Sequence, residues 1–157
     1  FQVLMIPQFI LLRNLRLVNT HMALILLQSF SPFGVFLLRQ FYLNIPNELL
    51  EAARIDGLSE FGIYRIIMLP LSRPALATLT IFTFVFVWND FLGPLIYLHS
   101  PNLRTIQLGI RMFISQYSAE YALIMAGSVC SLIPVVIIFL AAQKYFVEGI
   151  SFTGLKG

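Results

Sequence analysis

The sequence predicts an all-α, polytopic helical membrane protein: about three complete transmembrane helices, the end of a fourth, and a cytoplasmic two-helix loop. Hydrophobic residues make up 59% of the 157 residues and charged residues only 11%, whereas soluble domains carry about 25% charged residues. Residues 17–38 and 121–143 contain no Asp, Glu, Lys or Arg. Each stretch exceeds the roughly 20 residues that a helix needs to cross a bilayer.

The other elements follow from where the apolar runs begin and end. The chain opens on apolar sequence without an initiator Met, so we expect a fragment whose N-terminal part is missing. A third span contains one acidic residue, Asp90. Prolines in the spans are expected to bend them. Along residues 1–157 we expect the end of a span (1–12), a span (19–39), a cytoplasmic loop (44–69), a span (72–98), an extracytoplasmic loop (101–118), a span (121–144) and a cytoplasmic tail (145–157).

Positive charges indicate which side each loop occupies. Alternating spans place residues 44–69 and the C-terminal tail on the same side. An excess of Lys and Arg marks the cytoplasmic side of a membrane protein, and six on this side against four on the other favour a cytoplasmic loop. The six are Arg39, Arg54, Arg65, Arg73, Lys144 and Lys156, and the four are Arg13, Arg16, Arg104 and Arg111.

Two patterns overlap in the extracytoplasmic loop. Apolar residues alternate from Ile106 to Met112, which fits a strand, and a stripe from Ile106 through Ile110 to Tyr117 fits a helix. Because the rest of the chain is helical, we expect a short helix lying at the outer interface.

Residues 51–74 form a more polar, helix-forming segment between two apolar runs. A first helix is predicted over 47–56, with Pro46 at its first turn and Asn44 able to cap it. Gly57 is expected to stop this helix in a left-handed conformation.

A second short helix is predicted after this turn. Ser59 can cap it, and it runs to about Met68, where Pro70 and Pro74 end it and open the next span. Neither helix is long enough to cross a membrane.

The first of these helices has features of a docking surface. Ala52 and Ala53 are small and permit close approach by another surface, and Glu51 and Asp56 supply charge around them. The alternative is an ordinary cytoplasmic loop with ordinary helix caps.

The segment resembles a known signature. Glu51-Ala52-Ala53, then Asp56-Gly57, then Leu69-Pro70 and Pro74 resemble the EAA motif of permease subunits in binding-protein-dependent ABC importers. The stretches SPFGVFLLRQFY at 31–42, WNDF at 88–91 and QKYFVEGISFTGLKG at 143–157 resemble the carbohydrate-uptake branch, the maltose-type second permease with a MetI-like fold. The similarity covers essentially the whole chain, and it implies that about two spans and most of a third are missing.

The resemblance implies a coupling role for the loop. In this family the EAA loop inserts into a cleft on a cytoplasmic ATPase dimer. Glu51 would pair with a basic group there, and Ala52 and Ala53 would pack in the cleft. Gly57 would make the turn, and Asp56 would cap or orient the loop. The other implied partners are a second permease subunit and an extracytoplasmic solute-binding protein. The implied location is the cytoplasmic membrane of a bacterium or archaeon, as a multi-pass protein.

Four residues in the third span are candidates for the translocation path. An acid inside a bilayer is costly, about 2.5–3.5 kcal/mol at a helix centre, so Asp90 is expected to face a cavity or a partner. Asn89 and Asp90 are polar groups next to the aromatic rings of Trp88 and Phe91, a combination that suits sugars. The alternative is a structural role as polar contacts between helices.

Other chemistry is not indicated. The net charge of +3 is too small and scattered to suggest nucleic acid. We expect no cofactor and no metal. We interpret Cys130 as an inert buried thiol, and His21 and His99 as structural. Residues 149–156 imitate a nucleotide-binding loop, but Leu155 stands where that motif requires Lys, so ATP hydrolysis is assigned to another chain.

The leading hypothesis is a pore-forming, non-enzymatic permease subunit of an ATP-driven importer for sugars or oligosaccharides. A permease for another solute, such as glycerol phosphate, stays open. An integral membrane enzyme would need converging catalytic or metal-binding groups, and the polar residues in the spans are isolated. A purely structural anchor would not need the bent spans, Asp90 or the coupling loop.

Overall fold

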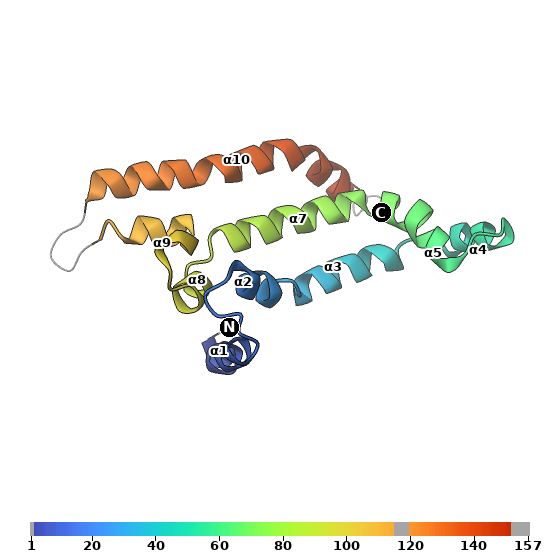
Figure 1. Ribbon diagram of the computed structural model, residues 1–157. Coiled ribbons are helices and arrows are strands. Elements are labelled where there is room, and N and C mark those ends of the chain that lie inside the picture. Colours follow the sequence, from blue (N-terminus) through green and yellow to red (C-terminus); the bar gives the residue numbers. More distant parts are fainter. Residues whose placement is uncertain (1, 115–119, 152–157) are drawn as a thin grey trace. The chain divides into compact units, whose positions relative to one another are not determined.

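The computed structural model describes residues 2–114 and 120–151 as a succession of helices (Figure 1). No described element is a β-strand, which confirms the all-α class for this part of the chain. The elements are η1 (Gln2–Leu4), α1 (Met5–Asn14), α2 (His21–Gln28), α3 (Pro32–Leu43), α4 (Asn47–Ile55), α5 (Glu60–Ile63), the π-helix η2 (Tyr64–Met68), α6 (Leu69–Leu71), α7 (Arg73–Trp88), α8 (Leu92–Tyr97), η3 (Pro101–Leu103), α9 (Ile106–Arg111) and α10 (Tyr121–Ser151).

One described helix is long and apolar enough to cross a membrane by itself. It is α10, over Tyr121–Ala141. Two pairs reach that length and apolarity only when each is taken as one broken span: α2 with α3, and Glu60–Leu71 with α7. The described residues therefore hold one clear span, or up to three if each broken pair crosses as a unit.

The span expected over 19–39 is divided into two helices. Helix α2 ends at Gln28, and α3 begins at Pro32 behind Ser31, whose hydroxyl accepts a hydrogen bond from the Gly34 N–H at 3.2 Å. A capping serine followed by proline is a helix start, so the chain begins a new helix where a bend was expected.

The span expected over 72–98 is also divided. Helix α7 ends at Trp88, and α8 starts at Leu92 with Pro94 in its first turn. In α10, by contrast, Pro134 lies inside a continuous helix. The tail expected from residue 145 begins as part of α10, whereas residues 152–157 lie outside the described residues.

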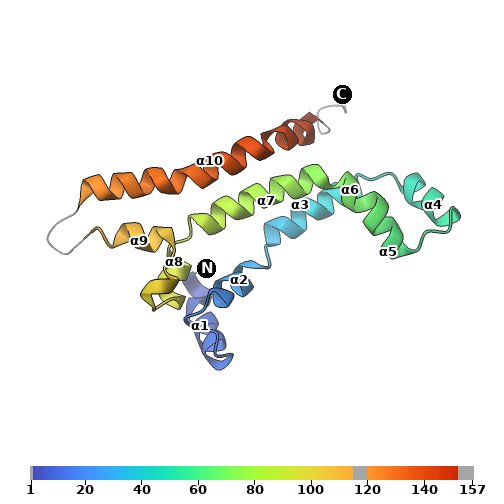
Figure 2. The same ribbon diagram turned by 45° about the horizontal axis from the view of Figure 1, so that its top comes forward.

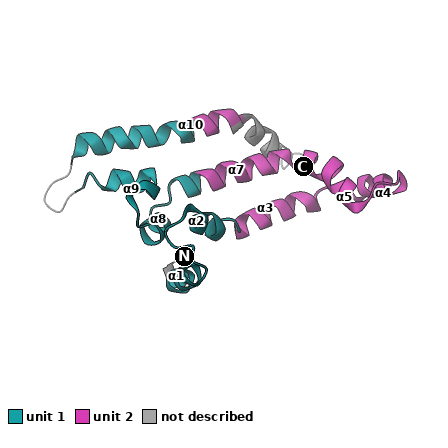
Figure 3. Cartoon of the chain, in the orientation of Figure 1, with its two compact units in different colours: residues 1–30, 85–136 teal, residues 31–84, 137–157 magenta. Residues whose placement is uncertain are grey.

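The chain divides into two compact units, coloured separately in Figure 3. Unit 1 comprises residues 1–30 and 85–136. Its core forms where Leu12 of α1, Ala23 of α2 and Tyr97 of α8 meet, each at most 2% exposed. Tyr97 also donates its hydroxyl to Oε1 of Gln8 at 3.1 Å.

Asn19 ties the start of α2 to the segment after α8 within unit 1. It adopts a φ of 63°, a left-handed conformation that Asn tolerates better than most residues. Its Oδ1 accepts hydrogen bonds from the backbone N–H groups of His99 and Ser100 at 2.9 and 2.8 Å. A ring nitrogen of His21 lies 3.0 Å from the Leu103 carbonyl oxygen.

Unit 2 comprises residues 31–84 and 137–157. Helices α3 and α7 lie side by side and antiparallel in it, as both views show (Figures 1 and 2). Phe33 packs edge-to-face on Phe82, with 5.7 Å between ring centroids. A side chain on Gly34 would come within 3.0 Å of Leu79, so a small residue sets the close approach of the two helices.

Candidate functional site

The first candidate site is the loop that begins with α4. Helix α4 begins at Asn47, as predicted, and ends at Ile55, one residue earlier than expected. Asn44 does not cap it: Asn44 follows the end of α3 and donates its Nδ2 to the Gln40 carbonyl at 2.8 Å. The N-cap position is occupied by Pro46, whose side chain makes no capping hydrogen bond.

Gly57 ends the helix as predicted, with a φ of 84°. The Leu58 N–H donates to the Ala53 carbonyl and the Gly57 N–H to the Arg54 carbonyl, both at 3.0 Å. This is the Schellman arrangement, which requires a left-handed residue after the helix. Asp56 lies at the end of the helix, directly before the turn.

Ser59 caps the second helix, as predicted. Its hydroxyl accepts a hydrogen bond from the Gly62 N–H at 3.2 Å. The helix does not end near Met68. It widens into the π-helix η2 and continues to Leu71, so that Pro70 lies inside α6. Proline has no N–H to pair in a helix interior, and π turns commonly accommodate such irregularities.

A sharp elbow joins this segment to α7. The helical run Glu60–Leu71 meets α7 at 70°. Ser72 lies at the elbow with no exposed surface, and its hydroxyl donates to the Leu69 carbonyl at 3.0 Å. Pro74 is the second residue of α7, where its missing N–H costs no hydrogen bond.

The two alanines of the motif lie on different faces of α4. Ala53 is 4% exposed and is covered by its own chain, which differs from the expectation that it packs against a partner. Glu51 and Ala52 are exposed. Ile55, one turn after both, is 86% exposed. The sequence reasoning missed Ile55, although an isoleucine between Arg54 and Asp56 is an apolar residue in a charged setting.

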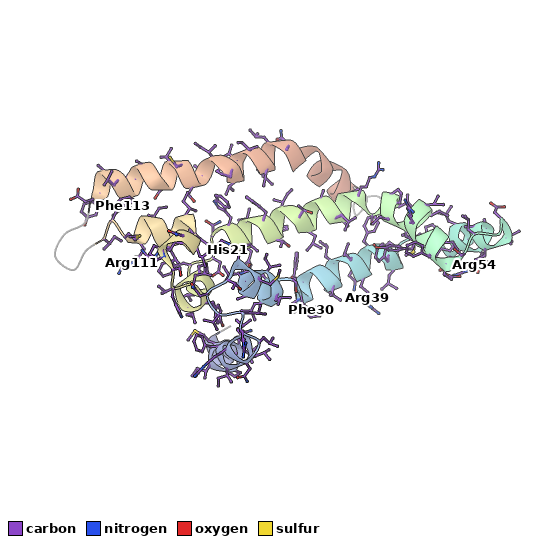
Figure 4. All side chains as sticks on the ribbon, viewed as in Figure 1. His21, Phe30, Arg39, Arg54, Arg111 and Phe113 are labelled. Atoms are coloured by element: carbon purple, nitrogen blue, oxygen red, sulfur yellow. The ribbon has the colours of Figure 1, made fainter. Side chains whose placement is uncertain are left out.

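An ion pair braces the turn between the helices. Nε of Arg54, labelled in Figure 4, donates to Oε1 of Glu60 at 2.7 Å, and its Nη2 donates to Oε2 at 3.3 Å. The hydrogen bond and the charge of Arg54 lower the pKa of Glu60, and the same contact raises the pKa of Arg54. Both side chains are largely exposed, so the pair orients the turn more than it stabilises it.

The second candidate site is the break between α7 and α8, in unit 1. Both carboxylate oxygens of Asp90 are engaged there. Oδ2 accepts a hydrogen bond from Nε2 of Gln28 at 2.7 Å, and Oδ1 accepts one from the Gly93 N–H at 3.2 Å. The structure therefore gives Asp90 polar contacts to α2 and α8, as a structural role between helices requires. No local sequence pattern indicates Gln28 as the partner of Asp90.

Trp88 and Asn89 connect to other helices of the same unit. The indole N–H of Trp88 donates to the Ser131 carbonyl of α10 at 2.9 Å. Nε2 of Gln107, on α9, lies 3.4 Å from Oδ1 of Asn89 and 3.2 Å from the hydroxyl of Ser131. Phe91 is partly buried and directly precedes α8. Gln107 and Ser131 are long-range partners that no local pattern marks.

The predicted residues thus form two separate groups. Glu51 to Gly57, with Pro70 and Pro74, belong to unit 2, and Trp88 to Phe91 belong to unit 1. Across the described residues, no three His, Cys, Asp or Glu side chains gather in a way that could hold a metal ion. The expected short helix in the loop 101–118 is present as α9, and residues 115–119, including Tyr117, lie outside the described residues.

Comparison with known proteins identifies the family. The family model described as "Binding-protein-dependent transport system inner membrane component" matches residues 1–152. The chain is 43% identical over 157 residues to the arabinooligosaccharides transport system permease protein AraQ of Halalkalibacterium halodurans, covering 100% of this chain and 56% of that protein. It is 39% identical to the lactose transport system permease protein LacG of Rhizobium radiobacter, covering 95% and 55%.

Two further relatives extend this result. The sn-glycerol-3-phosphate transport system permease protein UgpE of Salmonella typhi is 39% identical, with 95% of this chain and 54% of that protein covered. The crystal structure of a bacterial ABC transporter involved in the import of the acidic polysaccharide alginate matches with a TM-score of 0.80 at 26% identity, covering 90% of this chain and 55% of that one. The chain spans about half the length of the relatives it matches.

The family match extends through α4, Gly57 and the break at Asp90, so both candidate sites lie inside it. The resemblance drawn from the EAA motif is confirmed, and the family is one of membrane transport components. This chain belongs to the binding-protein-dependent transport system inner membrane components.

Proposed function

We propose that this chain forms part of the translocation path of an ATP-driven importer for sugars or oligosaccharides. In this proposal it is the C-terminal part of a permease subunit in the cytoplasmic membrane, paired with a second permease subunit. A separate ATPase dimer hydrolyses ATP, and an extracytoplasmic binding protein delivers the solute. The names of the relatives support the solute class, since two of those compared carry the names of sugar transport systems.

The observation that carries the coupling role is the exposed face of α4. Glu48, Glu51 and Ile55 follow one another at helical spacing and are all exposed, and Ala52 lies beside them. The only base on this helix, Arg54, is already paired with Glu60. The face is therefore acidic with one apolar residue at its end, and it suits a cleft that offers an apolar floor and a basic rim.

The turn supports the same role. Because Gly57 is left-handed and Ala53 is buried, α4 is held at a fixed angle to the helix that leads through Ser72 into α7. A push on α4 by an ATPase subunit would then reach α7 through a short, braced path. Pro70 lies in the helical run before the elbow at Ser72, and Pro74 lies in the first turn of α7 after it.

The test is copurification of the ATPase with the tagged transporter in detergent. The Glu51→Lys variant should retain at least about tenfold less ATPase, because a desolvated interface charge is reversed. The Glu120→Lys variant is the matched control, since Glu120 is also exposed but lies just before α10. Equal ATPase retention by both variants would contradict the coupling role.

A glycerol phosphate permease is the second candidate. The observation in its favour is that UgpE is as similar to this chain as LacG, at 39% identity each. Uptake into proteoliposomes by the complete transporter with its binding protein separates the two. Saturable uptake of an arabinooligosaccharide or lactose supports the sugar proposal, whereas saturable uptake of glycerol 3-phosphate alone supports the second candidate.

A further inference from the structure

Helix α9 lies along the first part of α10 in an antiparallel seam. Figures 1 and 2 both show the two helices side by side. At one end Nε2 of Gln107 donates to the Ser131 hydroxyl at 3.2 Å. At the other end Gly127 faces Ile110 so closely that an added Cβ would lie 3.0 Å from Cγ1 of Ile110. Residues three apart on α9 thus meet residues four apart on α10, which makes a continuous contact.

The hydrogen bonds that Gln107 of α9 makes are longer than the neighbouring hydrogen bond between Trp88 of α7 and Ser131 of α10. Nε2 of Gln107 is shared among three acceptors, the Ser131 hydroxyl, Oδ1 of Asn89 and the Trp88 carbonyl, at 3.2, 3.4 and 3.5 Å. N–H···O bonds are most often about 2.9–3.0 Å long. The indole of Trp88, by contrast, reaches the Ser131 carbonyl at 2.9 Å. The end of α7 is therefore joined to α10 without any help from α9.

Helix α9 itself has little support beyond the seam, although the segment after it is held by the Glu120 N–H, which donates to the Phe113 carbonyl at 3.0 Å, and by Nη1 of Arg104, which donates to Sδ of Met112 at 2.9 Å. Helix α9 has six residues, and helices this short are not stable by themselves. Its one buried side chain is Leu108, at 7% exposure, and the described residues that follow α9, 112–114, are exposed, with Met112 at 63%. Arg111, the last residue of α9, and Phe113, two residues later, are labelled in Figure 4. Helix α9 thus depends on the seam for its position.

We propose that α9 is a reversible latch on α10: it separates from α10 in each transport cycle, and Gln107 is the positioning residue that returns it. The long, shared contacts of Gln107 can break and re-form, while the bond between Trp88 and Ser131 keeps α7 and α10 together. The latch rests on the proposed import function and on the extracytoplasmic position expected for α9.

A disulfide across the seam tests the latch in the complete transporter. Cγ1 of Ile110 is one bond from Cβ, so Cβ of Ile110 and a Cβ added at Gly127 would lie about 4–4.5 Å apart, within the span that a disulfide bridges. The variant combines Ile110→Cys and Gly127→Cys in a Cys130→Ser background, since Cys130 is exposed on α10 and is not buried as the sequence predicted. Oxidation should then lock α9 onto α10.

Oxidation is expected to abolish uptake in proteoliposomes, and dithiothreitol is expected to restore it. The Cys130→Ser parent should transport equally under both conditions. Full uptake by the completely cross-linked protein would overturn the latch and leave the import function standing. Absence of uptake by the parent would instead count against the import function.

A labelling measurement keeps the latch testable if the double variant does not assemble. The single Ile110→Cys variant in the same background is treated with a maleimide, at rest and during ATP-driven uptake. Faster labelling during turnover supports the latch, and equal rates overturn it. Adding Gln107→Leu should speed labelling at rest about fivefold, since about one hydrogen bond is lost, whereas Gln107→Asn should recover part of that difference. No change with Gln107→Leu would remove Gln107 from the latch.

Discussion

A side chain on Gly93 would collide with the Asp90 carboxylate, because a Cβ there would overlap Oδ2, the oxygen that accepts the hydrogen bond from Gln28. The same added atom would also touch Leu24 of α2 at 3.5 Å. A side chain at this position would therefore have to displace the Asp90 carboxylate from its hydrogen bonds with Gln28 and with the Gly93 N–H.

Gly93→Ala should therefore destabilise unit 1. Overpacking at such a site costs about 1–3 kcal/mol, and it should lower the thermal midpoint of the purified protein in detergent. The same substitution in an Asp90→Ala background should cost much less, because the colliding oxygen is gone. Equal shifts in the two backgrounds would show that Asp90 is not what constrains Gly93.

Gln28 and Asp90 should act as a pair. Gln28→Leu removes the donor to a carboxylate, and a hydrogen bond to a charged group contributes about 1.5–3 kcal/mol. Asp90→Asn should be milder, since both amides can rotate to restore one hydrogen bond. We expect the thermal midpoint to fall with Gln28→Leu and the KM for solute uptake to stay unchanged with Asp90→Asn. An altered KM with an unchanged midpoint would instead place Asp90 on the translocation path.

Features that depend on neighbouring residues are predictable from the sequence, whereas long-range contacts such as that between Gln28 and Asp90 are not. The start of α4, the left-handed Gly57 and the Ser59 cap were predictable, because each depends on residues within one turn. Gln28 and Asp90 are 62 positions apart, and no periodicity connects them. The uncharged run around Ser31 predicts a single bent span, because nothing in that run marks Ser31 as the cap of a new helix.

The sequence also does not predict which residues of the loop are buried. Ala52 and Ala53 are the same residue type at adjacent positions. Only the packing of α4 against its own chain leaves Ala52 exposed and buries Ala53. The prediction that Asn44 caps α4 is wrong: Asn44 follows the end of α3, because asparagine suits the C-terminal end of a helix as well as the N-terminal end.

Gly57 should be sensitive to conformation and not to size. A Cβ at this position meets nothing within 4 Å, yet its φ is 84°. Gly57→Ala should cost about 1–2 kcal/mol, because a Cβ disfavours the left-handed region, while Gly57→Asn should retain most of the function. The readout is ATPase copurification together with uptake. If Asn and Ala at this position behave alike, the left-handed turn is not what the loop requires.

The pair of Arg54 and Glu60 should respond to acid only. In the folded protein the pKa of Glu60 lies below its ordinary value of 4.5. The contribution of the pair to stability is therefore complete above pH 4.5 and is lost as the pH falls through the lowered pKa. The difference in thermal midpoint between the unmodified protein and the Glu60→Gln variant should be constant between about pH 6 and pH 8 and should shrink below 4.5. A difference that varies near neutral pH would contradict this assignment.

Ala52 and Ala53 give the sharpest comparison, because identical substitutions should fail for different reasons. Ala53 is 4% exposed, so Ala53→Leu should overpack the loop at about 1–3 kcal/mol and lower the thermal midpoint of the transporter before any ATPase is added. Ala52 is exposed, so Ala52→Leu should leave the midpoint unchanged and reduce the ATPase retained.

The exposed isoleucine completes this comparison. Ile55→Asp places a charge at a position that is 86% exposed, so it should not affect the fold, and it should weaken ATPase retention as strongly as Ala52→Leu if both residues enter the cleft. Loss of retention with Ala53→Leu at an unchanged midpoint, together with full retention in Ile55→Asp, would mean that the partner contacts the other face of α4. The helix would then have to turn on binding, because that face is covered by its own chain.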